Sequence, residues 1–296
     1  MIQSGLELFK PETTAVVPER VIIYGRAGVG KTRLALELPD TDKWGEVLYY
    51  AADDNSEWLR SVRPTARKRI HVIKPRGSRH QENFQQFCMQ DWKNLLDPTT
   101  KKPLPADKQP YLNVRTLVVD TFTTVAFKTI QQIANDGTIS REEHFIIGDI
   151  KNGGFAIPSR SDYQGIDFAV KGFMDMLTDK QRDYNVILLC HEDSKEVSKG
   201  IMRGGPSVPG RRLLEDLPAT FNTVIRLIRE PMLVQPANVV QNKVVALTGN
   251  DGLYVSKLRE SDYSDEQHPL GKVILDQNPV NFWNQFDAYM SKKEQQ

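Results

Sequence analysis

The chain has 296 residues, of which 39% are hydrophobic and 26% charged, and its formal net charge at pH 7 is +1. This is the composition of a globular protein with a large core. It excludes a polybasic binder of the histone type, although a local basic groove remains compatible with it. The N-terminal residues show no secretory pattern, and no apolar stretch approaches the ~20 residues that cross a bilayer. The two cysteines, Cys88 and Cys190, lack metal-ligand spacing, so we expect a cytoplasmic protein with reduced thiols.

Apolar runs of strand length alternate with segments of helical spacing, and this alternation predicts a mostly parallel sheet with helices on both faces. The expected strands are residues 21–24, 47–51, 70–73, 116–120, 186–190, 223–229, 243–248 and 253–258. The expected helices are residues 31–38, 81–96, 123–134 and 166–180. Residues 135–163 and 194–212 are rich in glycine, and we expect them to be mobile surface segments.

The most specific pattern follows the first expected strand. Residues 25–32 match the phosphate-binding pattern G-x-x-x-x-G-K-[ST] at every position. Glycines let the backbone curl so that its N–H groups point at phosphate oxygens, and the following helix adds its dipole. A chance match is the alternative, but the required strand before and helix after are both expected here. The predicted nucleotide-binding residues are Gly25, Arg26, Ala27, Gly28, Val29, Gly30, Lys31 and Thr32. ATP and Mg²⁺ are the predicted cofactors, with Lys31 on the β- and γ-phosphates and the Thr32 hydroxyl on the metal.

Acidic and polar residues end other strands of the predicted sheet. Asp120 closes the run Leu-Val-Val-Asp and is the candidate for the second metal-holding group, although it can also cap the following helix. Asp53 and Asp54 follow the second strand and are candidates to polarise the attacking water, with a solvated loop or a helix N-cap as the alternatives. His191 ends the strand that follows Asp120 in the sequence. We consider it a candidate γ-phosphate sensor, with a purely structural histidine as the alternative.

The order of these parts resembles the ATPase core of RecA-type recombinases. It is similar in particular to phage-borne RecA-like AAA ATPases, which include the Sak-type single-strand annealing proteins. The similar region spans about residues 21–262. The resemblance implies a RecA-like α/β core over residues 21–262 with an insertion at about 74–110, an N-terminal extension at 1–20, and a C-terminal segment at 263–296. One position departs from the family, because the strand end that normally carries Glu carries Asp53, which is one methylene shorter.

The resemblance also implies two DNA-binding segments, at about residues 135–163 and 194–212. The basic residues of the second are suited to sequence-independent phosphate contact, with a solvated loop as the alternative. They are Lys195, Lys199, Arg203, Arg211 and Arg212. Lys257 and Arg259 match the basic residues that the family places against a neighbouring subunit's γ-phosphate, with ordinary surface charges as the alternative.

Taken together, these features predict a P-loop ATPase that binds single-stranded DNA, assembles into a ring or filament, and anneals or pairs strands. A single-strand-binding protein is an expected partner by resemblance, and no membrane is expected. A helicase-like motor or loader, a nucleotide-gated scaffold with little hydrolysis, and a small-molecule phosphotransferase are the alternatives. Stimulation of ATP turnover by DNA would discriminate among them.

Overall fold

The computed structural model describes residues 18–53, 60–136, 146–147, 155–179, 183–198, 201–209, 213–234, 239–249, 270–275 and 278–293. None of the helices in these ranges is both long and apolar enough to cross a membrane.

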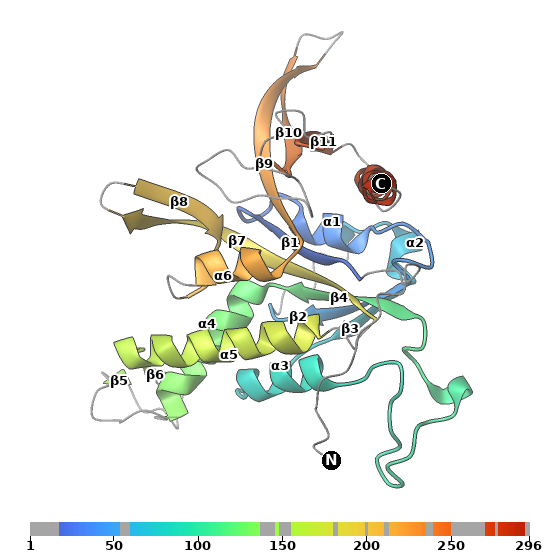
Figure 1. The fold of residues 1–296 in the computed structure, drawn as a ribbon, viewed down its shortest axis with the longest axis vertical. Coiled ribbons are helices and arrows are strands. Elements are labelled where there is room, and N and C mark those ends of the chain that lie inside the picture. Colours follow the sequence, from blue (N-terminus) through green and yellow to red (C-terminus); the bar gives the residue numbers. More distant parts are fainter. Residues whose placement is uncertain are drawn as a thin grey trace, which may run out of the picture.

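A nine-stranded sheet forms the centre of the molecule (Figure 1). Its parallel strands are, in spatial order, β3 (Ile70–Ile73), β2 (Glu46–Ala51), β4 (Val114–Asp120), β7 (Asn185–Ser198), β1 (Arg20–Gly25) and β9 (Thr223–Val234). Beyond β9, the antiparallel strands β10 (Val239–Leu247) and β11 (Lys272–Leu275) complete one edge, and β8 (Ile201–Pro206) pairs with the far end of β7. A separate small sheet joins β5 (Ile146–Ile147) to β6 (Phe155–Ala156). The predicted fold class, a mostly parallel α/β sheet with late antiparallel strands, is confirmed.

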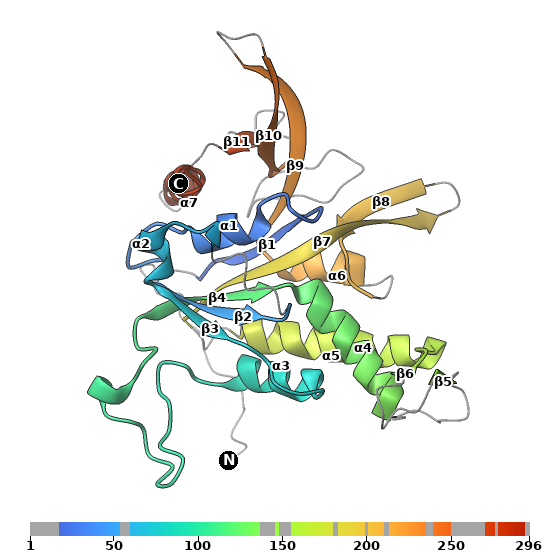
Figure 2. The same cartoon turned by 180° about the vertical axis from the view of Figure 1, so that it is seen from behind.

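Helices cover both faces of the main sheet (Figures 1 and 2). On one face lie α3 (His80–Met89), α4 (Phe122–Asp136), α5 (Arg160–Thr178) and α6 (Leu213–Thr220). On the other lie α1 (Lys31–Leu36), α2 (Pro64–Arg67) and α7 (Val280–Lys293). A single 3₁₀ turn, Ala106–Lys108, interrupts the long connection from α3 to β4.

Strand β1 shows why the sheet is buried on both faces. All six of its residues are buried, and its four hydrophobic side chains alternate between the two core clusters. Ile22 and Tyr24 pack with the α3–α6 layer, whereas Val21 and Ile23 pack with the layer of α1 and α7. A continuous apolar run of this kind is typical of a central parallel strand, whose faces are both covered by helices.

The final helix is attached to the helix that begins in the glycine-rich turn. Trp283 of α7 is fully buried against Trp44, with ring centroids 4.9 Å apart, and its indole Nε1 donates to the Leu34 carbonyl oxygen of α1 at 2.8 Å. Asp287 accepts hydrogen bonds from Trp44 Nε1 and Lys43 Nζ, at 2.8 Å each. Residues 278–293 therefore belong to the packed body. The division of the chain at residue 263, and the proposed insertion at 74–110, stay predictions.

Two strands extend beyond their neighbours and form projecting hairpins. Strand β7 has 14 residues and β9 has 12, whereas β1 between them has 6 (Figure 1). The expectation that residues 194–212 form a flexible loop is therefore wrong for their described first part, because β7 continues to Ser198 and pairs with β8. The backbone hydrogen bonds of a hairpin order this polar stretch without an apolar period in the sequence.

Two helix boundaries also differ from expectation. Helix α3 ends at Met89 rather than near residue 96, because the Asp91 carboxylate accepts the backbone N–H groups of Lys93 and Asn94 in a local turn. Helix α5 begins six residues before the expected position 166, at Arg160. There Ser159 and Asp162 form a capping box that satisfies the first N–H groups of the helix.

Candidate functional site: a phosphate loop and the strand ends beside it

The phosphate loop, residues 25–32, connects the end of β1 to α1. Gly28 and Gly30 have φ values of 71° and 109°, in the left-handed region that favours glycine. Gly25 has a different constraint, because a Cβ atom at this position would collide with the Leu227 carbonyl oxygen of β9. The glycines of the pattern are thus required by the backbone path, and the loop fits closely against the neighbouring strand.

Lys31 is the first residue of α1, and its side chain is buried against the start of the loop. Its Nζ donates to the carbonyl oxygens of Gly25 at 2.9 Å and Arg26 at 3.0 Å. Burial lowers the pKa of Lys31, and the nearby Asp120 carboxylate opposes that effect. A bound phosphate would offer the ammonium group charged acceptors in place of these two carbonyl oxygens, which makes Lys31 well suited to phosphate binding.

Thr32, Asp120 and Tyr49 converge beside the loop. Asp120 Oδ2 accepts hydrogen bonds from Thr32 Oγ1 at 2.6 Å and from the Tyr49 hydroxyl at 2.7 Å. Burial raises the pKa of Asp120, while these two donors lower it. Burial and the neighbouring Asp120 also raise the pKa of Tyr49, so its hydroxyl keeps its proton and acts as a donor.

The donor set fits Mg²⁺. The described residues contain no cluster of three or more His, Cys, Asp or Glu side chains that would hold a metal alone. Mg²⁺ in nucleotide sites uses one or two protein oxygens together with phosphates and water. The Thr32 hydroxyl at the start of α1 and the Asp120 carboxylate at the end of β4, 2.6 Å apart, match that requirement. Thr32 and Asp120 are therefore the residues that would hold the ion.

Asp53 lies at the end of β2, next to Asp120. The backbone N–H groups of Ala52 and Asp53 both donate to the Asp120 carbonyl oxygen, at 2.7 and 3.4 Å. Thr121 Oγ1 donates to the Asp53 carboxylate at 3.4 Å, and the Asp120–Thr121 peptide bond is cis. Lys128 Nζ donates to the Ala52 carbonyl oxygen at 2.9 Å. One candidate for water activation is thus adjacent to the metal candidate, whereas Asp54 lies outside the described residues.

His191 lies on β7, between the phosphate-loop strand and the strand of Asp120. It pairs with Gly25 in the parallel register, and its backbone N–H donates to Thr123 Oγ1 at 2.9 Å. The side chain is half-buried, and its pKa is lowered by burial and then by the positive charge of Lys31. The backbone N–H of Ser207, just after β8, donates to the His191 carbonyl oxygen at 2.7 Å. The histidine therefore lies at the base of the β7–β8 hairpin, with hydrogen bonds to α4 and to the residue that follows β8.

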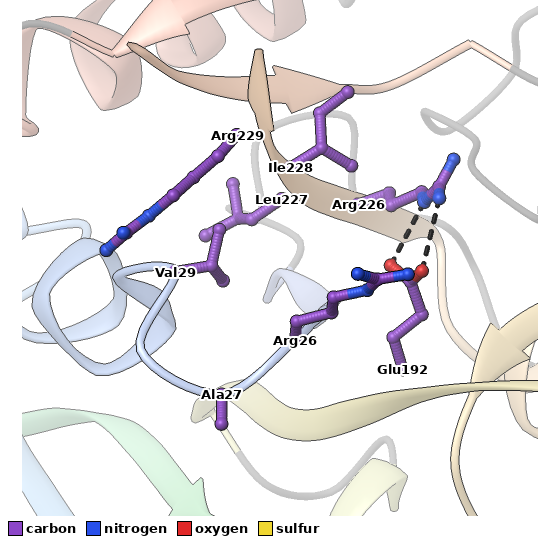
Figure 3. A pocket seen from close by; sticks show the side chains of 8 residues that line it. All are labelled: Arg26, Ala27, Val29, Glu192, Arg226, Leu227, Ile228 and Arg229. Atoms are coloured by element: carbon purple, nitrogen blue, oxygen red, sulfur yellow. Dashed lines mark hydrogen bonds and ion pairs between the residues drawn. The ribbon is translucent and has the colours of Figure 1, made fainter. Parts of the chain in front are cut away.

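A cavity of about 440 Å³ lies on the β9 side of the phosphate loop (Figure 3). At one end, Arg226 of β9 makes a bidentate ion pair with Glu192 of β7, with both N–O distances 3.1 Å. At the other end, Arg229 Nη2 donates to the Gly28 carbonyl oxygen at 2.7 Å. The lining residues are Arg26, Ala27, Val29, Glu192, Arg226, Leu227, Ile228 and Arg229. Of these, sequence reasoning identified only the loop residues.

The remaining predicted residues divide into two groups. Lys195 and Arg203 are Cα partners across the β7–β8 pair, so the hairpin brings these two basic positions together in the backbone register. The others lie outside the described residues and stay predictions; they are Lys199, Arg211, Arg212, Lys257 and Arg259.

A family model described as an AAA domain matches residues 18–259, most of the chain. The chain belongs to this AAA domain family. The matched region contains the phosphate loop, Asp120 and both projecting hairpins. Among solved structures, this AAA-domain protein is similar to the crystal structure of the RadB recombinase, with 15% sequence identity, coverage of 78% of this chain and 80% of that chain, and a TM-score of 0.41. No curated protein matches its sequence.

Proposed function

We propose that the protein is a Mg²⁺-dependent ATPase that binds single-stranded DNA, assembles into an oligomer, and anneals or pairs DNA strands. The observation that carries the ATPase part is the meeting of Thr32 Oγ1 and Asp120 Oδ2 at 2.6 Å beside the complete phosphate loop. A chance glycine turn after β1 would not be expected to place the Thr32 hydroxyl next to a carboxylate. That carboxylate, Asp120, is on β4, which is separated from β1 in the sheet by β7.

Different groups of the chain would bind different parts of the Mg²⁺–ATP complex. Backbone N–H groups of the loop and the start of α1 would hold the phosphate oxygens. Lys31 would exchange its two carbonyl acceptors for phosphate oxygens. Mg²⁺, held by Thr32 and Asp120, would neutralise charge on the β- and γ-phosphates.

Asp53 is the proposed group for orienting the attacking water. Its backbone lies against Asp120, and Thr121 Oγ1 donates to its carboxylate. Because Asp is shorter than Glu by one methylene and catalytic geometry is sensitive to about 1 Å, we expect slow turnover. This departure also favours the second candidate function, a nucleotide-gated DNA-binding scaffold in which hydrolysis is minor.

The β7–β8 hairpin supports the DNA-binding proposal. It carries Lys195 and Arg203 as register partners, and β7 continues from His191 into the hairpin, where its pairing with β8 is irregular between Glu196 and Ser198. A shift at His191 on nucleotide binding would therefore act on the strand that carries Lys195. Lys199, Arg211 and Arg212 would add to the positive charge, and Lys257 and Arg259 would act on the nucleotide of a neighbouring subunit. The phage-type annealing role rests on the family resemblance of the sequence.

The test is ATP hydrolysis by the purified protein without DNA, with duplex DNA and with single-stranded DNA, at low and moderate salt. We expect single strands to stimulate turnover and the stimulation to fade as salt rises, because phosphate contacts release counterions. Lys31→Ala should abolish turnover in every condition. Arg211→Glu/Arg212→Glu should keep the basal rate and lose the stimulation. Turnover that survives Lys31→Ala would refute the ATPase proposal, and ATP binding without any response to DNA would refute the recombination proposal.

A further inference from the structure

Tyr49 is placed to control the Asp120 carboxylate. It lies on β2, next to β4 in the sheet, and its side chain shares a face with α1. Both side chains are buried, with 2% of Tyr49 and 7% of Asp120 exposed. In this setting water cannot readily replace the hydroxyl as a hydrogen-bond donor.

Both described donors to the Asp120 carboxylate act on one oxygen. Thr32 Oγ1 and the Tyr49 hydroxyl reach Oδ2, at 2.6 and 2.7 Å. Within the described residues, Oδ1 accepts no hydrogen bond, which leaves it available to a metal shell. Thr32 donates from α1 and Tyr49 from β2, and two donors from different elements fix the rotation of the carboxylate plane about χ2. Thr32 alone would leave that rotation poorly restrained, because its hydroxyl is itself a predicted metal ligand.

We propose that Tyr49 is a positioning residue for the Mg²⁺–nucleotide site: its hydroxyl holds Asp120 in the orientation that receives the ion. This inference rests on the proposed nucleotide-binding function. Partners that orient a metal ligand typically contribute about 10- to 100-fold to metal affinity or activity. Tyr49 contacts neither nucleotide nor metal in this account and acts only through Asp120.

The chain supplies a matched control in the adjacent residue. Tyr50 is equally buried, with 2% exposed, but its side chain packs in the opposite core cluster. Its ring lies 5.1 Å from that of Phe84 and 4.8 Å from that of Phe87. Tyr50→Phe therefore removes a buried tyrosine hydroxyl from the same strand without touching Asp120.

The experiment is equilibrium binding of ATP to the full chain, measured with excess Mg²⁺ and with EDTA, for the wild type, Tyr49→Phe and Tyr50→Phe. The readout is the gain in ATP affinity that Mg²⁺ provides. We expect Tyr49→Phe to bind ATP normally in EDTA and to lose about 10-fold or more of the Mg²⁺-dependent gain. Tyr50→Phe should match the wild type in both conditions. An unchanged gain in a folded Tyr49→Phe protein, or an equal loss in Tyr50→Phe, would overturn the inference.

A double-mutant cycle shows whether Tyr49 acts through the carboxylate. In an Asp120→Asn background, Tyr49→Phe should cause no further loss of the Mg²⁺-dependent gain, and a further loss would overturn the inference. If Tyr49→Phe alone fails to fold, the comparison of Asp120→Asn with Asp120→Asn/Tyr49→Phe remains informative. In that background residue 120 carries a neutral amide, so removal of the Tyr49 hydroxyl leaves no buried charge without its donor. If the wild type itself gains nothing from Mg²⁺, the proposed function fails and the inference fails with it. A normal wild-type gain that is insensitive to Tyr49 contradicts only the inference.

Discussion

Loss of Arg226 should strongly destabilise the protein, and removing Glu192 as well should restore much of the loss. The two side chains are only 12% and 8% exposed, and their bidentate contact joins β7 to β9 across the point where β1 ends. Arg226→Met leaves the Glu192 carboxylate buried without its main counter-ion. Breaking one half of a buried pair costs about 3–5 kcal/mol, most of it from the uncompensated charge.

Urea unfolding of the wild type, Arg226→Met and the double variant Arg226→Met/Glu192→Gln measures this difference. The single variant should lower the free energy of unfolding by about 3–5 kcal/mol, and the double variant should recover at least half of that. Lys171→Met is the matched control, because Lys171 pairs with Asp216 at 2.7 Å while the side chains are 45% and 40% exposed. An exposed pair contributes about 0–1 kcal/mol. A double variant as unstable as Arg226→Met would refute the assignment of the loss to a buried unpaired charge.

Two further predictions concern the loop and the histidine beside it. Gly25→Ala should lower the free energy of unfolding by about 1–3 kcal/mol and abolish ATP binding, because the new methyl group collides with the Leu227 carbonyl; normal ATP binding by this variant would contradict the close fit of loop and strand. Burial and Lys31 lower the pKa of His191 below its ordinary value of 6.5, so between the lowered pKa and 6.5 the unfolded chain binds more protons than the folded one. The contribution of neutral His191 to the free energy of unfolding is therefore fully present above pH 6.5. It is lost as the pH falls from 6.5 through the lowered pKa of the folded state. The fall in melting temperature from pH 7.5 to 5.5 should be smaller in His191→Gln, and an equal fall would exclude this histidine as a contributor.

The parts that the sequence predicts well are those with a local pattern. The phosphate loop, the apolar strands of the parallel sheet and the placement of Asp120 at a strand end each depend on a few consecutive residues. The start of α5 is not among them: the expected start at residue 166 is six residues late, although Ser159 and Asp162 have the spacing of a capping box.

The contacts that were missed depend on lateral strand order and register. Tyr49 and Asp120 are 71 residues apart in the chain, and they meet only because β2 and β4 are neighbours in the sheet. Arg226 meets Glu192 only because β7 and β9 flank β1 on either side, with Arg226 opposite Tyr24 and Glu192 one residue past the partner of Gly25. No sequence period distinguishes such a tyrosine or arginine from one that faces the core or the solvent. The β7–β8 hairpin was missed for a related reason, since its stability comes from backbone pairing within a polar segment.

The contact between Trp283 and α1 affects the order in which parts of the protein can fold during translation. The hydrogen bond of Trp283 to Leu34 joins residues that are 249 positions apart, so the ribosome makes α1 long before the helix that covers it. Until α7 is released, the apolar face of α1 lacks its aromatic cover. A nascent chain that already contains the entire phosphate loop would thus hold it on an incompletely packed helix. Nucleotide binding should therefore mature late, after translation has passed residue 283, and chaperone contact with the unfinished chain should concentrate on this face.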